Sequence, residues 1–309
     1  MDRAEQFEEQ RAHLRAVAYR MLGSAAEAED AVQETWLRLS RVDGEVDNLG
    51  GWLRTVLSRI CLDMLRTRKA RREEPLSELP EHGWAREDPE TEAVLADSVG
   101  RALLVVLETL APAERIAFVL HDLFAVPFDR IAPIVDRTPV AAKKLASRAR
   151  QRLRGTPASP AGELARQRKV VEAFLAAARD GNLDALLTLL APDVVRRADP
   201  ATVPPGVPAV QRGARAVAEG VLKFGRPARF AEVALVDGEV GAVVAPGGRL
   251  RLALTFTFDG DRVTAYEIIA SPARLARLDL ATLSEPRRSA DRPAGSPAAP
   301  PARPSASSR

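Results

Sequence analysis

The sequence has very little cysteine and no long hydrophobic run. Its single cysteine, Cys61, excludes an intrachain disulfide and a Cys-x-x-Cys metal site. No apolar stretch approaches the roughly 20 residues that cross a bilayer, and the first residues lack the basic-then-apolar pattern of a signal peptide. We therefore expect a cytoplasmic protein without a cysteine-based metal site.

Aromatic residues and histidine are also scarce. Aromatic side chains make up 5% of the 309 residues, and the three histidines, His13, His82 and His121, all lie in the N-terminal half. Histidine is the most frequent general acid or base at neutral pH, so the C-terminal half lacks the usual means of such catalysis. With 46% hydrophobic and 28% charged residues, the chain is long enough for at least two globular cores.

Residues 1–72 have the periodicity of helices and predict a small all-α domain. Apolar residues recur at helical spacing in three segments. Ser24 followed by Glu27 is a capping-box pattern that predicts the start of the second helix. The third segment, GWLRTVLSRICLDMLRTRKARR at 51–72, combines an apolar face with a run of arginines. Residues 73–97 are acidic, contain prolines and lack periodicity, which predicts a linker.

Residues 98–155 predict a second helical domain that ends in a helix-turn-helix. A short helix, a tight turn and a basic helix follow one another, and Thr138 and Pro139 have the residue types of a helix N-cap and first helical position. Pro133 lies inside the first helix of this pair and should shorten or kink it.

The remaining chain predicts an α+β domain and a disordered tail. The segment 156–163 has the composition of a flexible linker. Two helices and a meander of antiparallel strands separated by glycine turns predict an α+β domain over 164–283. Proline, alanine, serine and arginine dominate residues 284–309, which we expect to be disordered.

Positive charge is concentrated on two of these helices. In segment 51–72 many basic residues oppose the single acid Asp63, so the exposed side suits phosphates, although it could also be an ordinary solvated face. The basic helix after Pro139 favours DNA, because a helix-turn-helix places its second helix in the major groove. The basic residues of the two helices are Arg54, Arg59, Arg66, Arg68, Lys69, Arg71 and Arg72, and Lys143, Lys144, Arg148, Arg150, Arg152 and Arg154.

These motifs carry a family resemblance. AEDAVQETWLRLSR followed by segment 51–72 looks like the second conserved region of a bacterial RNA polymerase sigma factor of the extracytoplasmic-function group. LAPAERIAFVLHDLFAVPFDRIAPIVDRTPVAAKKLASRARQRLRG resembles its fourth region, and the two blocks, within residues 3–154, have the family's order and spacing. The resemblance implies two all-α sigma domains, the second with a helix-turn-helix. It also implies core RNA polymerase and promoter DNA as partners, and no cofactor.

The resemblance also implies roles for single residues. The DAVQETWLRL helix would dock on the polymerase clamp coiled coil through Asp30, Gln33, Glu34, Leu37 and Arg38. Segment 51–72 would read and hold open the minus-ten element through Trp52, Arg54, Thr55, Arg59, Arg66 and Arg68, since stacking and cationic groups suit unpaired bases. The implied minus-thirty-five contacts are Arg137, Lys143, Lys144, Arg148 and Arg150.

The α+β segment resembles the SnoaL-like, or NTF2-like, cone fold that is appended to the sigma-J type of these factors. Related cone folds include cyclases and isomerases, so an enzyme must be considered. Arg197, Asp199, Tyr266 and Glu267 could line a pocket, but we expect structural or surface roles for them. A short linker would keep this domain at high effective concentration beside the sigma domains, which favours a regulatory role with or without a small ligand.

Three functions remain open on the sequence alone. The first is an alternative sigma factor with a fused control domain. The second is a stand-alone helix-turn-helix regulator that senses a small molecule through the cone domain. The third is a cyclase or isomerase with a DNA-binding passenger, which the absence of histidine from the C-terminal half counts against.

Overall fold

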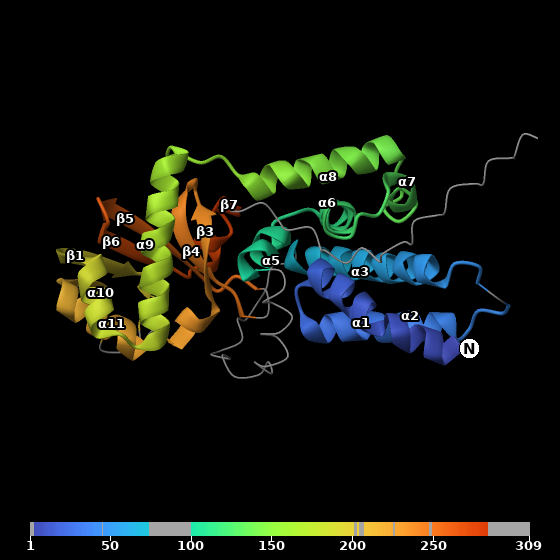
Figure 1. Ribbon diagram of the computed structural model, residues 1–309, viewed down its shortest axis with the longest axis horizontal. Coiled ribbons are helices and arrows are strands. Elements are labelled where there is room, and N and C mark those ends of the chain that lie inside the picture. The colour runs from blue at the N-terminus through green and yellow to red at the C-terminus, as the bar shows by residue number, and fades with distance from the viewer. Residues whose placement is uncertain are drawn as a thin grey trace, which may run out of the picture.

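The structure is a computed structural model that describes residues 3–44, 46–73, 100–200, 203, 207–224, 226–246 and 249–283. The expected acidic linker, beyond its first residue, and the expected disordered tail lie outside the described residues. An all-α part and an α+β part lie side by side, and the long helix α8 (Pro139–Arg154) runs along the all-α part toward the sheet (Figure 1).

The first helical unit confirms the three expected helices: α1 (Arg3–Leu22), α2 (Ala25–Leu39) and α3 (Leu49–Glu73). The Ser24 hydroxyl accepts a hydrogen bond from the Glu27 amide at 3.4 Å, so Ser24 is the N-cap of α2. The Glu27 carboxylate does not close a capping box but pairs with Arg68 of α3. The pattern therefore located the helix start, while the glutamate connects two helices.

The second helical unit contains α5 (Arg101–Glu108), α6 (Pro112–Phe118), a π-helical segment (Val119–Leu123), α7 (Phe128–Ile131) and α8. Thr138 caps α8 as expected, because its hydroxyl accepts from the Ala141 amide at 3.3 Å. The helix before the turn is only four residues long and ends two residues before Pro133, which confirms the expected shortening.

The C-terminal part is the expected α+β domain. Helices α9 (Ala161–Asp180), α10 (Leu183–Leu189) and α11 (Ala214–Phe224) accompany a seven-stranded sheet, and α12 (Pro272–Leu275) follows the last long strand. The sheet order is β2-β1-β6-β5-β4-β3-β7. Its strands are β1 (Leu190–Ala198), β2 (Val210–Arg212), β3 (Ala231–Val236), β4 (Glu239–Val244), β5 (Leu252–Asp259), β6 (Arg262–Ile269) and β7 (Leu280–Ala281).

The antiparallel meander is confirmed for β3 to β6, but β1 pairs with β6 in parallel. Local patterning did not reveal this pairing because the two strands are far apart in sequence. The segment before α9 lies against the β3–β4 turn, where the Ala158 amide donates to the Gly238 carbonyl at 2.9 Å.

The two faces of the sheet belong to different cores. Ala242 and Val244 of β4 pack with α9, α10 and α11, whereas Val243 between them packs in the core shared with the helical units. Helix α5 lies at this junction (Figure 1), and all its residues from Ala102 to Leu107 are buried. Glu232 of β3 accepts a hydrogen bond from the Ala102 amide at 3.1 Å, so the sheet caps the α5 N-terminus.

We expect Glu232→Ala to lower the free energy of unfolding of the full chain by about 1 kcal/mol, because it removes a carboxylate from a helix N-terminus. Equilibrium urea unfolding measures this change. As a control, Glu219→Ala removes only an exposed ion pair with Arg215 on α11 and should cost a few tenths of a kcal/mol. Equal losses in the two variants would show that the Glu232 contact does not stabilise the junction.

Candidate nucleic-acid and protein interfaces

The expected polymerase contacts form one face of α2, which we call the docking face: Asp30, Gln33, Glu34, Leu37 and Arg38. The opposite face of α2 is buried in the helical core. Leu37 is 41% exposed, and beside it the Glu34 carboxylate pairs with Arg38 at 2.9 Å. An exposed leucine flanked by charged groups is suited to a protein partner. The structure therefore brings all five residues together on a surface that the described chain leaves uncovered.

The expected minus-ten residues at the start of α3 are half-buried. Trp52 packs against the helical core, and Arg54 and Thr55 are also partly covered. The Thr55 hydroxyl donates to the Gly51 carbonyl one turn earlier at 2.9 Å. Stacking of Trp52 on a base would therefore need exposure of more of its ring.

Two arginines farther along α3 contact the helix-turn-helix. A guanidinium nitrogen of Arg59 donates to the Pro133 carbonyl at 3.1 Å. Arg66 lies 3.8 Å from the Asp136 carboxylate and 3.5 Å from Asp63 on its own helix. Pro133 and Asp136 belong to the turn between α7 and α8, so the two expected DNA-binding units face each other through these arginines.

Arg68 is more deeply involved, with a side chain only 15% exposed. It pairs with Glu27 of α2 and with Glu108 of α5, the latter at 3.5 Å, and donates to the Leu22 carbonyl at 3.1 Å. Sequence analysis placed Arg68 on a basic surface. In this arrangement it bridges the two helical units and is not available to DNA.

Arg115 of α6 lies in the same interface and was missed by sequence analysis. It is 2% exposed, and burial lowers the pKa of Arg115 to about 10, although Glu108 opposes that shift, so it stays charged at neutral pH. The available signal was a lone arginine inside the apolar run of α6. We call Glu27, Arg68, Glu108 and Arg115 the interdomain charge cluster.

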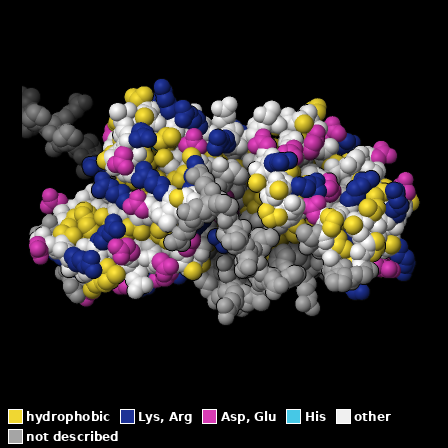
Figure 2. Space-filling model, turned by 180° about the vertical axis from the view of Figure 1, so that it is seen from behind, with side chains coloured by type: hydrophobic (Ala, Val, Ile, Leu, Met, Phe, Trp, Pro, Cys, Tyr) yellow, Lys and Arg dark blue, Asp and Glu magenta, His cyan; other side chains and the backbone are white. Residues whose placement is uncertain are grey.

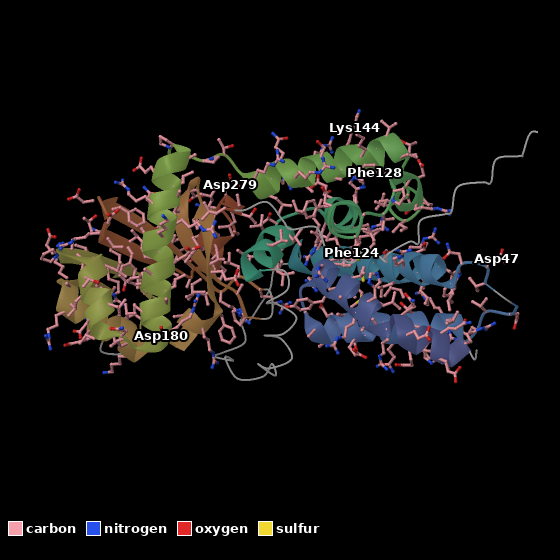
Figure 3. The ribbon with its side chains drawn as sticks, viewed as in Figure 1. Asp47, Phe124, Phe128, Lys144, Asp180 and Asp279 are labelled. Carbon is pink, nitrogen blue, oxygen red and sulfur yellow. The ribbon has the colours of Figure 1, made fainter. Side chains whose placement is uncertain are left out.

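Helix α8 presents the expected minus-thirty-five residues differently. Lys143, Lys144 and Arg148 are exposed, and Figure 3 shows Lys144 on the outer side of the helix. Arg150 instead lies 2.9 Å from the Asp122 carboxylate, and Arg137 donates to the Asp136 carbonyl. On the face in Figure 2, basic side chains stand among acidic ones. Of the expected minus-thirty-five residues on α8, Lys143, Lys144 and Arg148 are therefore the exposed cations.

Of the four polar residues considered for catalysis in the C-terminal part, Arg197 is exposed and Tyr266 lines an apolar pocket, whereas Asp199 and Glu267 have structural partners. Asp199 is buried and accepts hydrogen bonds from the Ala270 and Ser271 amides, each at 2.9 Å, and from Arg274. Burial alone would raise the pKa of Asp199, but these hydrogen bonds outweigh it and lower that pKa. Arg274 also binds Glu267 at 2.8 Å. Asp199, directly after β1, and Glu267 of β6 thus both hold α12 through Arg274.

The described residues contain neither a membrane-spanning helix nor a cluster of metal-binding side chains. None of their helices is both long and apolar enough to span a bilayer. In the same part of the chain, histidine, cysteine, aspartate and glutamate side chains form no group of three or more that could hold a metal ion. The lone Cys61 is buried, and burial raises the pKa of its thiol to about 12.

Comparison with known proteins matches both helical units to families. Residues 7–71 match Sigma-70 region 2, and residues 100–153 match Sigma-70, region 4. These matches coincide with the units that carry the docking face and the helix-turn-helix.

Similar proteins extend over most of the chain. ECF RNA polymerase sigma factor SigJ of Mycobacterium tuberculosis is 39% identical over 282 residues, which are 87% of this chain and 87% of that protein. Probable ECF RNA polymerase sigma factor SigI of the same species is 34% identical, over 86% of this chain and 92% of that one. The crystal structure of the M. tuberculosis extracytoplasmic function sigma factor SigJ is 35% identical, covers 88% of this chain and 98% of its own, and has a TM-score of 0.44. The chain therefore belongs to the extracytoplasmic-function (ECF) RNA polymerase sigma factors.

Proposed function

We propose that this sigma factor recruits core RNA polymerase through the docking face and directs it to promoters through α3 and α8. The proposal extends the family assignment to the residues of this chain. It is supported by the exposure of Leu37 and its charged neighbours and by the exposed cations of α8. Its place of action is the cytoplasm, where bacterial RNA polymerase and promoters are found.

The main observation behind the proposal is that three α3 arginines expected to bind DNA instead contact other groups of the protein. Arg59, Arg66 and Arg68 contact a carbonyl or carboxylate of the second helical unit. A guanidinium that occupies such a partner cannot at the same time bind a phosphate or base with the same nitrogens. In this proposal the arrangement is a closed state, and Arg68 becomes available to the minus-ten element only when the helical units separate.

The C-terminal domain acts in this proposal as a non-catalytic regulator that favours the closed state. It buries one side of α5 and caps its N-terminus through Glu232. Because α5 also carries Glu108 of the interdomain charge cluster, the domain holds that carboxylate in place for Arg68. Weakening the closed state should therefore increase transcription, provided that the polymerase surface is unchanged.

Run-off transcription with purified core RNA polymerase on genomic promoter fragments tests the central activity. We expect promoter-specific transcripts with the full chain and their loss with Leu37→Ala, because this substitution removes an exposed apolar contact without opening the core. Val210→Ala, at an exposed position of β2, is the matched control and should transcribe normally. Specific DNA binding without transcripts would instead support a stand-alone regulator.

The closed state makes a second prediction. Glu108→Gln removes the carboxylate charge that faces Arg68 but adds no bulk, so we expect about fivefold more transcript, equivalent to about 1 kcal/mol. Glu172→Gln, which breaks a pair with Arg168 within α9, should leave the yield unchanged. Unchanged or lower yield with a folded Glu108→Gln protein would show that this pair does not restrain activity.

The exposed lysines of α8 make a third prediction. Lys144→Ala should weaken binding of the full chain to duplex DNA and reduce the slope of log K against log salt by about one, because one phosphate contact is lost. Fluorescence anisotropy over a salt series measures both quantities. Lys169→Ala, at an exposed position of α9, is the control and should change neither. A slope that is the same in Lys144→Ala and wild type would exclude Lys144 from the interface.

A further inference from the structure

The C-terminal domain contains a small, partly open pocket that is separate from the surfaces described above. It lies between the sheet, α9 and α11 and has a volume of about 110 Å³. Its walls are mainly apolar and include Phe174, Leu254 and Ile268. Two polar side chains, Arg196 of β1 and Tyr266 of β6, also line it.

Arg196 is an unusual residue for such a place. It is only 8% exposed, and one guanidinium nitrogen donates to the Pro208 carbonyl at 2.5 Å. Its Nε is buried and has no hydrogen-bond partner, and no carboxylate of the described residues forms an ion pair with it. A buried charge without a counter-charge is costly, so an anion in the pocket would stabilise the Arg196 guanidinium.

Tyr266 adds a second polar group to the same wall. Arg196 and Tyr266 are directly paired in register on the parallel strands β1 and β6. Burial raises the pKa of Tyr266, and the nearby Arg196 opposes this only in part, so the phenol is neutral and keeps its proton. A neutral phenol beside a guanidinium gives the wall two hydrogen-bond donor groups.

We propose that this pocket binds a small organic monoanion, a carboxylate with a compact apolar body. The carboxylate would lie beside the Arg196 guanidinium and accept a hydrogen bond from the Tyr266 hydroxyl, while the body packs against Phe174, Leu254 and Ile268. An apolar cavity of about 150 Å³ can hold benzene, so this pocket of about 110 Å³ suits an acid whose apolar body is smaller than a benzene ring. Binding does not depend on the proposed transcription function and is tested separately.

Strand β4 connects the pocket to the sigma units. Val244 of β4 lines it, while the preceding residue, Val243, packs on the opposite face in the core shared with the helical units. A bound acid and the α5 junction therefore contact opposite faces of the same strand. If the proposed function holds, occupancy of the pocket can change the stability of the closed state through this strand.

Isothermal titration calorimetry of the full chain with isobutyrate tests the binding. We expect isobutyrate to bind at least tenfold more tightly than its neutral counterpart, isobutanol, because only the acid neutralises Arg196. Arg196→Met keeps an unbranched side chain but removes the charge, and it should weaken acid binding at least tenfold. Arg197→Met, at the exposed neighbouring position, is the matched control and should bind like wild type.

Several results would overturn the proposal. These are the absence of acid binding by the folded wild-type chain at millimolar concentration, equal affinity for the acid and its neutral counterpart, and equal weakening by the two methionine variants. Circular dichroism checks that Arg196→Met folds. If it does not, Tyr266→Phe decides, since it retains the ring and removes one donor, and acid affinity should then fall several-fold. Unchanged affinity in that variant would count against the proposed carboxylate position.

Discussion

Burial of helix α5 is the constraint on which the arrangement of the whole chain depends. Its side chains from Ala102 to Leu107 are all buried, and the helix contacts α8 of its own unit and β3 and β7 of the C-terminal domain. A helix that is apolar on all sides needs cover on all sides. Each buried valine or leucine contributes roughly 1.5–3 kcal/mol relative to exposure, so removal of the sheet would leave a large apolar surface in water. The second helical unit therefore depends on the C-terminal domain to keep α5 covered.

Beside this apolar junction, electrostatic contacts hold the two helical units in one arrangement. The arginines of α3 contact oxygen atoms within the protein itself, namely the Pro133 carbonyl and the carboxylates of Asp136 and Glu108. Partly exposed pairs of this kind contribute at most about 1 kcal/mol each and weaken with salt. Their combined effect can favour one arrangement without making it permanent. Such reversibility suits the proposed closed state, in which the arginines exchange these partners for DNA.

Local sequence patterns were sufficient for most elements. Ser24, Thr138 and Pro133 predicted two helix starts and one shortened helix because caps and prolines act within one turn. Alternation and glycine turns predicted β3 to β6, whereas β2 and β7, with three and two residues, are too short to show a period. The contact residues proposed on α2 and α8 were named from the family resemblance, because its motifs contain them.

Contacts between distant parts of the chain could not be predicted in this way. Arg68 had the same local surroundings as the other α3 arginines, and only the fold brings Glu108 to it. Arg196 has a charged neighbour, Arg197, and nothing in the sequence says which of the two points inward. That choice depends on how β1 pairs with β6, which involves residues about 70 positions away.

The two-faced sheet has a consequence for how the sequence of this protein can change. Gly241 of β4 sits so close to β5 that an added Cβ would lie 2.4 Å from the Leu254 carbonyl oxygen, which fixes the register of the strand. Because neighbouring residues of β4 serve opposite cores, insertion or deletion of one residue there would exchange their faces. Side chains of β4 other than at Gly241 can be replaced one at a time, whereas the length of the strand must stay constant. Changes in length must therefore accumulate in the loops, while β4 keeps the parity that connects the pocket to the sigma core.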